Sequence, residues 1–138
     1  MNMNLKEVFN ACALGELKII KDYLNNGGDP NIINEFGLPL ISLAVENSRI
    51  EIIKILLERG ANINIQDEFG QTTLLFAVDS SIDAVIRSGG EASVEIINLL
   101  LENGADLKIP DNQGRTPISI AETYNYTKMI EYLNTRLS

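Results

Sequence analysis

The sequence predicts an all-α fold, a solenoid of four helix–turn–helix units joined by short β-turn loops that we call fingers. Three observations support this prediction. Glycine-centred segments recur with a period of 33 residues, apolar residues recur at helical spacing within the units, and stretches rich in Asn, Asp and Gly separate them. A fixed period of this length is typical of stacked repeats, in which each unit packs only on its neighbours.

Two series of glycines carry the period: Gly27, Gly60 and Gly104 follow apolar helical segments, and Gly37, Gly70 and Gly114 precede them. In both series the first spacing is 33 residues and the second is 44. The third unit therefore contains an insertion of 11 residues. Comparison of Ala44–Ile50 with Ala77–Val94 places the additional residues at about 81–91. We expect one domain over residues 1–138, with units at about 5–33, 34–66, 67–110 and 111–138.

The two outer units have polar positions that suit the ends of an array. The first unit lacks a finger and has the polar Asn10 where other units are apolar. The second helix of the last unit has Thr127 and Glu131, and the terminal glycine motif is missing there. Because the outer repeats of a solenoid need a polar outer face, we expect both ends to be closed and the protein to be complete.

The second unit illustrates how a unit is built. Its second helix begins near Ile50, continues with apolar residues at helical spacing, and ends before Gly60, which we expect to adopt the left-handed conformation of a helix terminus. Pro39 occupies the position where a threonine would cap the first helix, so this cap is weakened.

In the third unit, residues 82–86 are expected to extend the first helix by about one turn, and residues 87–93 to form a flexible return. The insertion is either a functional loop or a neutral elongation. In the fourth unit Thr116 is the predicted N-cap, Pro117 is the first helical residue, and the helix ends near Glu122.

From about Leu5 to Leu137 the chain resembles the ankyrin repeat, with its 33-residue period, T-P-L-like segments, paired helices and G-A-D/N terminators. The resemblance implies stacked L-shaped units, projecting fingers, a concave face lined by the first helices, and protein partners. One departure is that the histidine of the family motif, which ties neighbouring loops, is absent, and this implies repeats of modest stability. The residues in its place are Phe9, Ser42, Leu75 and Ser119.

The resemblance also implies that a partner contacts the finger tips and the concave face. The candidate partner-binding residues are Glu35, Phe36, Leu38, Glu46, Asn47, Glu68, Phe69, Gln71, Asp79, Ser80, Asn112, Gln113 and Arg115. Phe36 and Phe69 occupy the same position in adjacent fingers. They are either anchors for a partner, as exposed aromatic residues often are, or they stack on each other and stiffen the fingers.

Charge and composition limit the possible functions. The chain has 19 acidic and 11 basic residues, a net charge of -8, which argues against nucleic acid, since binding phosphates requires a basic patch. We expect a basic protein partner, which the acidic surface would attract. The alternative is that the acidic excess only keeps the protein soluble. No stretch is apolar enough to span a membrane, and the N-terminus, residues 1–7, is not that of a signal peptide.

We expect no enzymatic activity, because no nucleophile–base pair, ligand set or phosphate loop is recognisable and the chain has no histidine. We expect no catalytic residues, no metal and no cofactor. The single cysteine, Cys12, is expected to be a buried structural thiol, and it excludes an internal disulfide. A cytoplasmic, monomeric protein is the resulting expectation.

Two functions remain as hypotheses. The insertion resembles that of small bacterial ankyrin proteins that act as immunity proteins beside polymorphic toxins, which implies that the acidic surface covers a basic toxic domain. The residues that carry this resemblance are Ala77, Val78, Asp79, Ser88, Gly89, Gly90 and Glu91. The alternative is a scaffold or host-directed effector module that binds a regulatory protein.

Overall fold

The computed structural model describes residues 3–137, and over this range it contains eight α-helices and no β-strand. Met1, Asn2 and Ser138, which the expected domain includes, lie outside the described residues. The helices are α1 (Leu5–Leu14), α2 (Leu17–Asn25), α3 (Leu40–Glu46), α4 (Ile50–Glu58), α5 (Thr73–Ser88), α6 (Glu95–Glu102), α7 (Pro117–Thr123) and α8 (Thr127–Asn134). The predicted all-α solenoid is confirmed.

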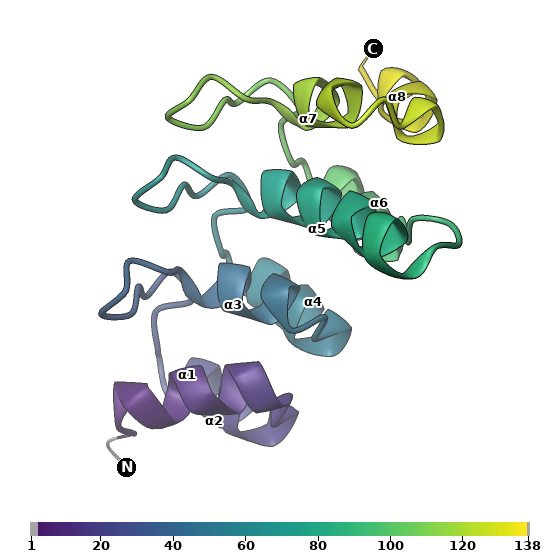
Figure 1. The fold of residues 1–138 in the computed structure, drawn as a ribbon. Coiled ribbons are helices and arrows are strands. Elements are labelled where there is room, and N and C mark those ends of the chain that lie inside the picture. The colour runs from purple at the N-terminus through teal and green to yellow at the C-terminus, as the bar shows by residue number, and fades with distance from the viewer. Residues whose placement is uncertain (1–2, 138) are drawn as a thin grey trace.

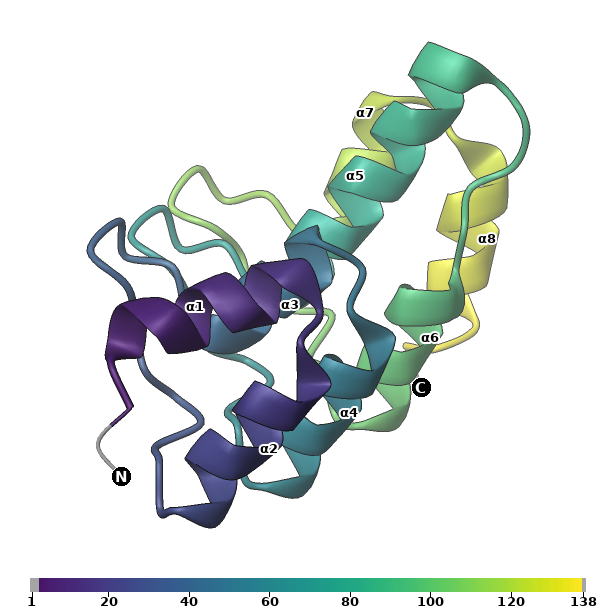
Figure 2. The ribbon, with the colours of Figure 1, turned by 90° about the horizontal axis from the view of Figure 1, so that it is seen from below.

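The helices form four antiparallel pairs that stack in chain order, and the fingers project from one side of the stack (Figure 1). The first helices, α1, α3, α5 and α7, pack each on the next, and each also packs on the second helix of its own pair. The second helices follow one another along the other side of the stack (Figure 2). The exposed side of the first helices, which we call the first-helix face, therefore adjoins the fingers.

The core lies between the helices of a pair and between neighbouring pairs. Its large, fully buried side chains come from six of the eight helices: Ile20, Leu40, Ile41, Ile52, Ile53, Leu56, Leu74, Leu75, Ile82, Ile97, Leu100 and Met129. Burial of such a side chain stabilises the fold by roughly 1.5–3 kcal/mol before conformational entropy is subtracted. The polar Asn10, Thr127 and Glu131 are all exposed, as predicted for the outer pairs.

The second helices end in a shared hydrogen-bonding motif. After α4, the amide of Ala61 donates to the carbonyl of Leu56 at 2.9 Å, and the amide of Gly60 donates to that of Leu57 at 3.1 Å. Gly60 has φ +90°, a conformation that glycine adopts without steric strain. Gly27 and Gly104 repeat this arrangement after α2 and α6, so the predicted left-handed helix termini are confirmed.

Each finger is built around one Asn or Asp side chain. The Oδ1 atom of Asn34 accepts hydrogen bonds from the amides two and four residues later, each at 2.9 Å. Asp67 and Asp111 accept the equivalent pairs of hydrogen bonds in the next two fingers, at the same distances. Because a short acceptor side chain closes the turn locally, the finger conformation follows from these few residues.

The caps of the first helices follow the sequence. Thr72 caps α5 and Thr116 caps α7, each accepting from the amide three residues later at 3.2 Å. Ser119, at the position of the absent histidine, completes a capping box by accepting from the amide of Thr116 at 2.8 Å. Pro39 makes no side-chain cap on α3, as predicted.

Neighbouring units are tied together by asparagines. The side-chain oxygen of Asn31 accepts from the amide of Asn62 at 2.7 Å, and that of Asn64 accepts from the amide of Asp106 at 2.8 Å. The two asparagines are 33 residues apart and make the same contact with the next unit. They link loops of adjacent units in a chain that has no histidine.

The insertion differs from the prediction. Helix α5 has 16 residues whereas α3 and α7 have 7, so the extension is more than two turns rather than about one. Arg87 and Ser88, expected in the return, are helical, and the segment without helix is 89–94. The reason is packing: Ile82 is 1 % exposed and belongs to the core, so the added helix is anchored.

Candidate protein-binding surface

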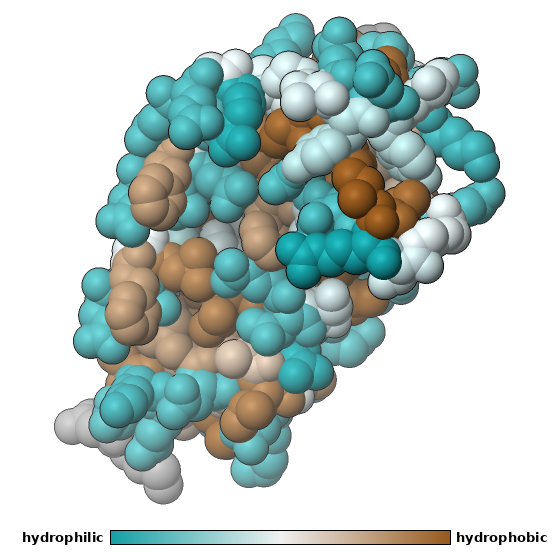
Figure 3. Space-filling model, viewed as in Figure 1, coloured by the Kyte–Doolittle hydropathy of each residue, from teal (hydrophilic) through white to brown (hydrophobic). Residues whose placement is uncertain are grey.

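The finger tips expose two aromatic side chains. Phe36 is 74 % exposed and Phe69 is 68 % exposed, so neither ring is buried by stacking on the other. The amide of Phe36 is held by Asn34 and the amide of Phe69 by Asp67, both at 2.9 Å. In Figure 3, hydrophobic side chains gather among hydrophilic ones on the side of the molecule from which the fingers project. The hydrogen-bonded finger turns therefore present apolar surface to solvent.

Acidic side chains flank these rings. Glu35 and Glu68, the residues that precede the two phenylalanines, are both exposed. The carboxyl carbon of Glu68 lies 3.5 Å from the position that a Cβ on Gly37 would occupy, so this side chain reaches toward the second finger. The two tips and their glutamates form an aromatic and acidic strip.

The fourth finger is docked on the third, which sequence analysis did not anticipate. The backbone amide of Asn112 donates to the carbonyl of Phe69 at 2.9 Å, and its side-chain amide donates to the carbonyl of Glu68 at 3.0 Å. Asn112 was predicted to contact a partner, and the structure shows that its side chain joins two fingers. The only signal in the sequence is that Asn112 replaces the glutamate of the earlier fingers.

The remaining candidates on the fourth finger are exposed. Gln113 stands at the tip position that the phenylalanines occupy in the other fingers. Arg115 donates from Nε to the carboxylate of Asp111 at 2.8 Å, and the Asp111 side chain is 4 % exposed. Burial alone would raise the pKa of Asp111. Hydrogen bonds from the backbone and side chain of Arg115 and from the amide of Gln113 outweigh this effect, so the pKa of Asp111 lies below its ordinary value.

The base of the third finger brings together three of the predicted residues. Leu38, Glu46 and Gln71 line a small hollow that also includes Asp67 and Phe76. Burial, and second the carboxylate of Asp67, raise the pKa of Glu46 above its ordinary value. An acidic side chain that is partly desolvated is favourably placed to gain from a cationic partner group.

Farther along the first-helix face, the side chains of two other predicted residues donate hydrogen bonds to backbone carbonyls of α3 and α5. Asn47 donates from its side chain to the carbonyl of Leu43 at 2.9 Å, and the hydroxyl of Ser80 donates to the carbonyl of Ala77 at 3.3 Å. Both residues are exposed.

Asp79 faces the fourth unit. Its carboxylate raises the pKa of the Tyr124 phenol, and Asp83 acts in the same direction. Asp79, Asp83 and Tyr124 therefore lie close together, on α5 and at the end of α7, and form an acidic and aromatic part of the first-helix face.

A cavity of about 300 Å³ lies between the end of α3 and the long α5. Glu46 and Ser80, both predicted, line it. The rest of the lining comes from residues that were not among the predicted partner contacts: Val45, Ser48, Phe76, Ala77, Ser81, Ala84, Ser93, Ile96 and Ile97. Their separation along the chain explains why sequence patterns did not identify the cavity.

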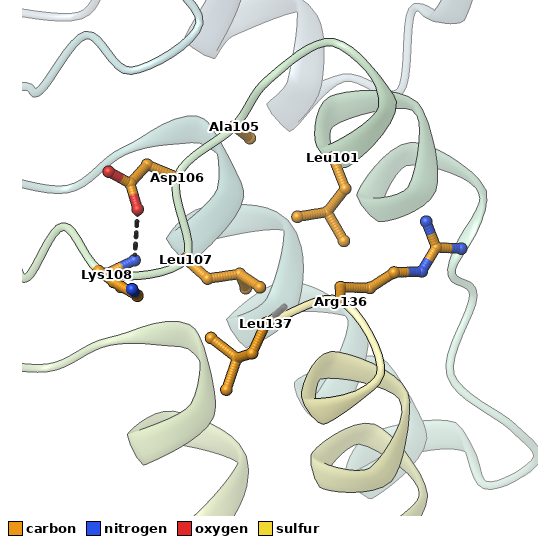
Figure 4. Close-up of a pocket in the computed structure, with 7 residues that line it drawn as sticks. All are labelled: Leu101, Ala105, Asp106, Leu107, Lys108, Arg136 and Leu137. Carbon is orange, nitrogen blue, oxygen red and sulfur yellow. Dashed lines mark hydrogen bonds between the residues drawn. The ribbon is translucent and has the colours of Figure 1, made fainter.

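A second hollow, of about 310 Å³, lies at the C-terminal end of the stack (Figure 4). Leu101, Leu107 and Leu137 lie around it, with Lys108 and Arg136 on opposite sides (Figure 4). Arg136 is held by Asn98, to which it donates at 2.6 Å, and its guanidinium lies over the ring of Tyr132. The hollow is lined by the loop after α6 and by the end of the chain after α8.

Within residues 3–137, potential metal-ligating side chains do not gather into a cluster. No group of three or more Cys, Asp or Glu side chains in this part of the chain is placed to hold a metal ion. Cys12 is buried, donates to the carbonyl of Leu40 at 3.4 Å, and burial raises the pKa of its thiol to about 12. The thiol is therefore protonated and structural, as predicted. No helix in residues 3–137 has the length and hydropathy needed to cross a bilayer.

Comparison with known proteins agrees with the geometry. A family model described as ankyrin repeats, in three copies, matches residues 8–88. A search of curated proteins finds no match to the chain.

Proposed function

The chain belongs to the ankyrin-repeat family of generally non-catalytic protein-interaction modules, and we propose that its partner binds across the finger tips and the concave, first-helix face. The surface consists of the thirteen candidate residues. Among them, Asn112 contributes by holding the fourth finger against the third. The observation that carries this proposal is the exposure of Phe36 and Phe69 at equivalent tips. Aromatic side chains, phenylalanine included, are enriched at protein interfaces, and large buried aromatic residues often serve as anchors there.

The partner that fits this surface is a basic protein domain. The chain has a net charge of -8, and Glu35, Glu68, Glu46 and Asp79 lie beside the aromatic tips or along the first helices. Complementary charge raises the association rate and disfavours partners of like charge. We propose that binding occludes the partner, as an immunity protein covers a toxin; a scaffold or host-directed effector would use the same surface for a regulatory protein.

The further expectations are part of the same proposal. Residues 1–138 form one domain, and the chain acts as a monomer in the cytoplasm. The stacking of each helix pair on the next and the single, buried Cys12 support it. Light scattering coupled to size exclusion would measure the mass, and a concentration-dependent dimer would contradict the monomer.

The double substitution Phe36→Ala and Phe69→Ala tests the surface. It should weaken binding of the captured partner by about 100-fold, since each aromatic anchor contributes at least about 1–2 kcal/mol. Ile86→Ala, which removes a 61 % exposed apolar side chain from α5 away from the fingers, is the matched control and should bind normally. Helical circular dichroism and the melting midpoint should stay near those of the wild type in both variants.

The partner itself is identified by affinity capture from the source cell, mass spectrometry and a salt titration. A single basic protein, toxic when expressed alone and bound more weakly as salt rises, supports occlusion by an immunity protein. Many weak partners, or one acidic partner indifferent to salt, support the scaffold instead. Unchanged binding by the double variant would exclude the finger tips as the interface.

A further inference from the structure

The cavity between α3 and α5 lies where another unit of the same chain places an arginine. Arg49 directly precedes α4, and its Nε donates to the carbonyl of Ala13, at the end of α1, at 2.9 Å. A Cβ on Gly15 would lie 3.2 Å from the guanidinium carbon, so the Arg49 side chain lies directly over the turn between α1 and α2. One unit thus reaches back to cover the helix end and turn of the preceding unit.

The repeat period identifies the corresponding positions one unit later. Ile50 and Val94 are each 10 residues before the glycine that follows their helix, so Ser93 is the counterpart of Arg49. Glu46 and Ser48 are likewise the counterparts of Ala13 and Gly15, since Ala11 matches Ala44. At this step between units the reaching arginine is replaced by a serine.

The fourth unit confirms that this position reaches backward. Its counterpart is Tyr126, the residue before α8, and its hydroxyl accepts from the amide of Ala92 in the third unit at 3.2 Å. Ser93 cannot do the same, because its side chain is short and its carbonyl accepts from the hydroxyl of Ser81 at 2.7 Å. The cavity of about 300 Å³ is the space left at this step.

The lining of the cavity suits a cation with several donors. The carbonyl of Glu46 accepts no hydrogen bond from the described residues, whereas its counterpart Ala13 accepts one from Arg49. This carbonyl is at the C-terminal end of α3, where the helix dipole favours positive charge. The lining also contains the Glu46 side chain, four serines and no basic residue, and Phe76 and Ile96 supply apolar surface for an alkyl chain.

We infer that this cavity receives an arginine side chain of the protein partner, in the place that Arg49 takes one unit earlier. The guanidinium donates to the carbonyl and carboxylate of Glu46, and its alkyl chain packs beside Phe76. Ser48 has a Cβ where Gly15 has none, so the guanidinium lies slightly farther from the turn than that of Arg49. The inference deepens the proposed function, on which it rests, by naming the residue type recognised and its position.

The test uses a small probe, so that it does not depend on the partner. Titration with N-acetyl-arginine amide, followed by amide chemical shifts in NMR spectra, should shift Glu46, Ser48, Ser81 and Ser93 saturably, with a dissociation constant on the order of a millimolar. N-acetyl-citrulline amide, of similar shape but neutral, should bind about tenfold more weakly. The lysine analogue should also bind more weakly, because it lacks the planar donor pair.

Two variants make the result specific. Ser93→Arg should abolish the shifts by filling the cavity from within, while Ser88→Arg, the same substitution at the exposed end of α5, should leave them unchanged. Glu46→Gln should weaken binding of the arginine probe several-fold. This variant provides the test if the Ser93→Arg variant does not fold.

Equal binding of arginine and citrulline, or shifts spread over the acidic surface and unchanged by Ser93→Arg and Glu46→Gln, would overturn the inference. That outcome leaves the finger-tip interface intact, because the phenylalanine variants test it separately with the captured partner. The opposite outcome is also possible to recognise: the arginine probe binds specifically, but the phenylalanine double variant binds the partner normally. That result would contradict the finger-tip interface and leave the arginine site standing.

Discussion

The turn between the two helices of a pair uses one residue in the left-handed backbone region. Gly15 has φ +81° there, and Ser48 and Asn125 have φ +55° and +53°. Residues with a side chain are strained in this region, and Asn tolerates it better than Ser. Ser81 is the counterpart of Ser48 in the third unit, but it lies within α5. The same residue type at the same repeat position therefore has two backbone conformations.

This difference predicts substitutions of opposite sign. Ser48→Gly should raise the free energy of unfolding by about 0.5 kcal/mol, because relief of left-handed strain is partly offset by the greater freedom of glycine in the unfolded chain. Ser81→Gly should lower it by about 1–2 kcal/mol, because glycine disfavours helix and the hydrogen bond to Ser93 is lost. Urea denaturation measures both, and changes of the same sign would contradict the assignment.

Asp111 shows how one carboxylate stabilises a finger. It accepts from the amides of Gln113 and Arg115 and from the Arg115 guanidinium, and its pKa is lowered in the folded state. Asn34 makes the same pair of backbone contacts in the second finger without a charge. The second finger therefore shows that asparagine can replace aspartate at this position and keep both backbone hydrogen bonds.

Asp111→Asn should reduce the free energy of unfolding at pH 7 by about 1 kcal/mol, and Asp111→Ala, which also opens the turn, by about 2–3 kcal/mol. Because the folded pKa is lowered, the charge-dependent stability is present above the unfolded value of 3.8 and disappears as pH falls through the folded pKa. Thermal melts from pH 7 to pH 2 should show wild type and Asp111→Asn converging in acid. A constant difference at all pH values would exclude the carboxylate as its source.

At the scale of the element, the fingers differ in how they are supported. The third and fourth fingers are joined through Asn112, which requires a close approach at Gly70. A Cβ on Gly70 would lie 2.8 Å from the backbone nitrogen of Asn112, whereas the nearest atoms to one on Gly37 belong to the Glu68 side chain, the closest at 3.5 Å. Both glycines have positive φ, at +75° and +76°.

Gly70→Ala should therefore be more destabilising than Gly37→Ala. Both incur about 1 kcal/mol of left-handed strain, and Gly70→Ala should cost about 1–2 kcal/mol more, because the fourth finger must move. Chemical denaturation of the two variants provides the comparison, and amide shifts of Asn112 and Gln113 should change only in Gly70→Ala. Equal losses of stability would show that the fingers are not coupled.

The length of α5 is also an element-scale result. The repeat period places the insertion in the third unit, but the composition of residues 82–86 predicts only about one turn of additional helix. Ser81 alone does not reveal whether the chain turns or continues, because Ser48 is the same residue and turns. Burial of Ile82 against the core and the hydrogen bond from Ser81 to Ser93 are contacts that favour the longer helix.

At the scale of the whole molecule, the repeats build one continuous surface from separate units. The first helices pack in sequence, so the finger tips, the Glu46 hollow, the cavity and Asp79 lie on adjoining units. Five of the 11 basic residues form ion pairs in residues 3–137, which leaves much of the acidic surface uncompensated. A partner that spans these units would contact aromatic side chains at the finger tips and carboxylates along the first helices.

The sequence by itself determined the helix pairs, their period, the glycine termini and the finger turns. These features depend on local chemistry: apolar residues at helical spacing, a backbone that only glycine adopts freely, and Asn or Asp side chains that bond to nearby amides. Only the tertiary structure decided the length of α5, the contact of Asn112 with the third finger, and the cavity left by Ser93. Each depends on contacts between distant segments, which no local pattern specifies.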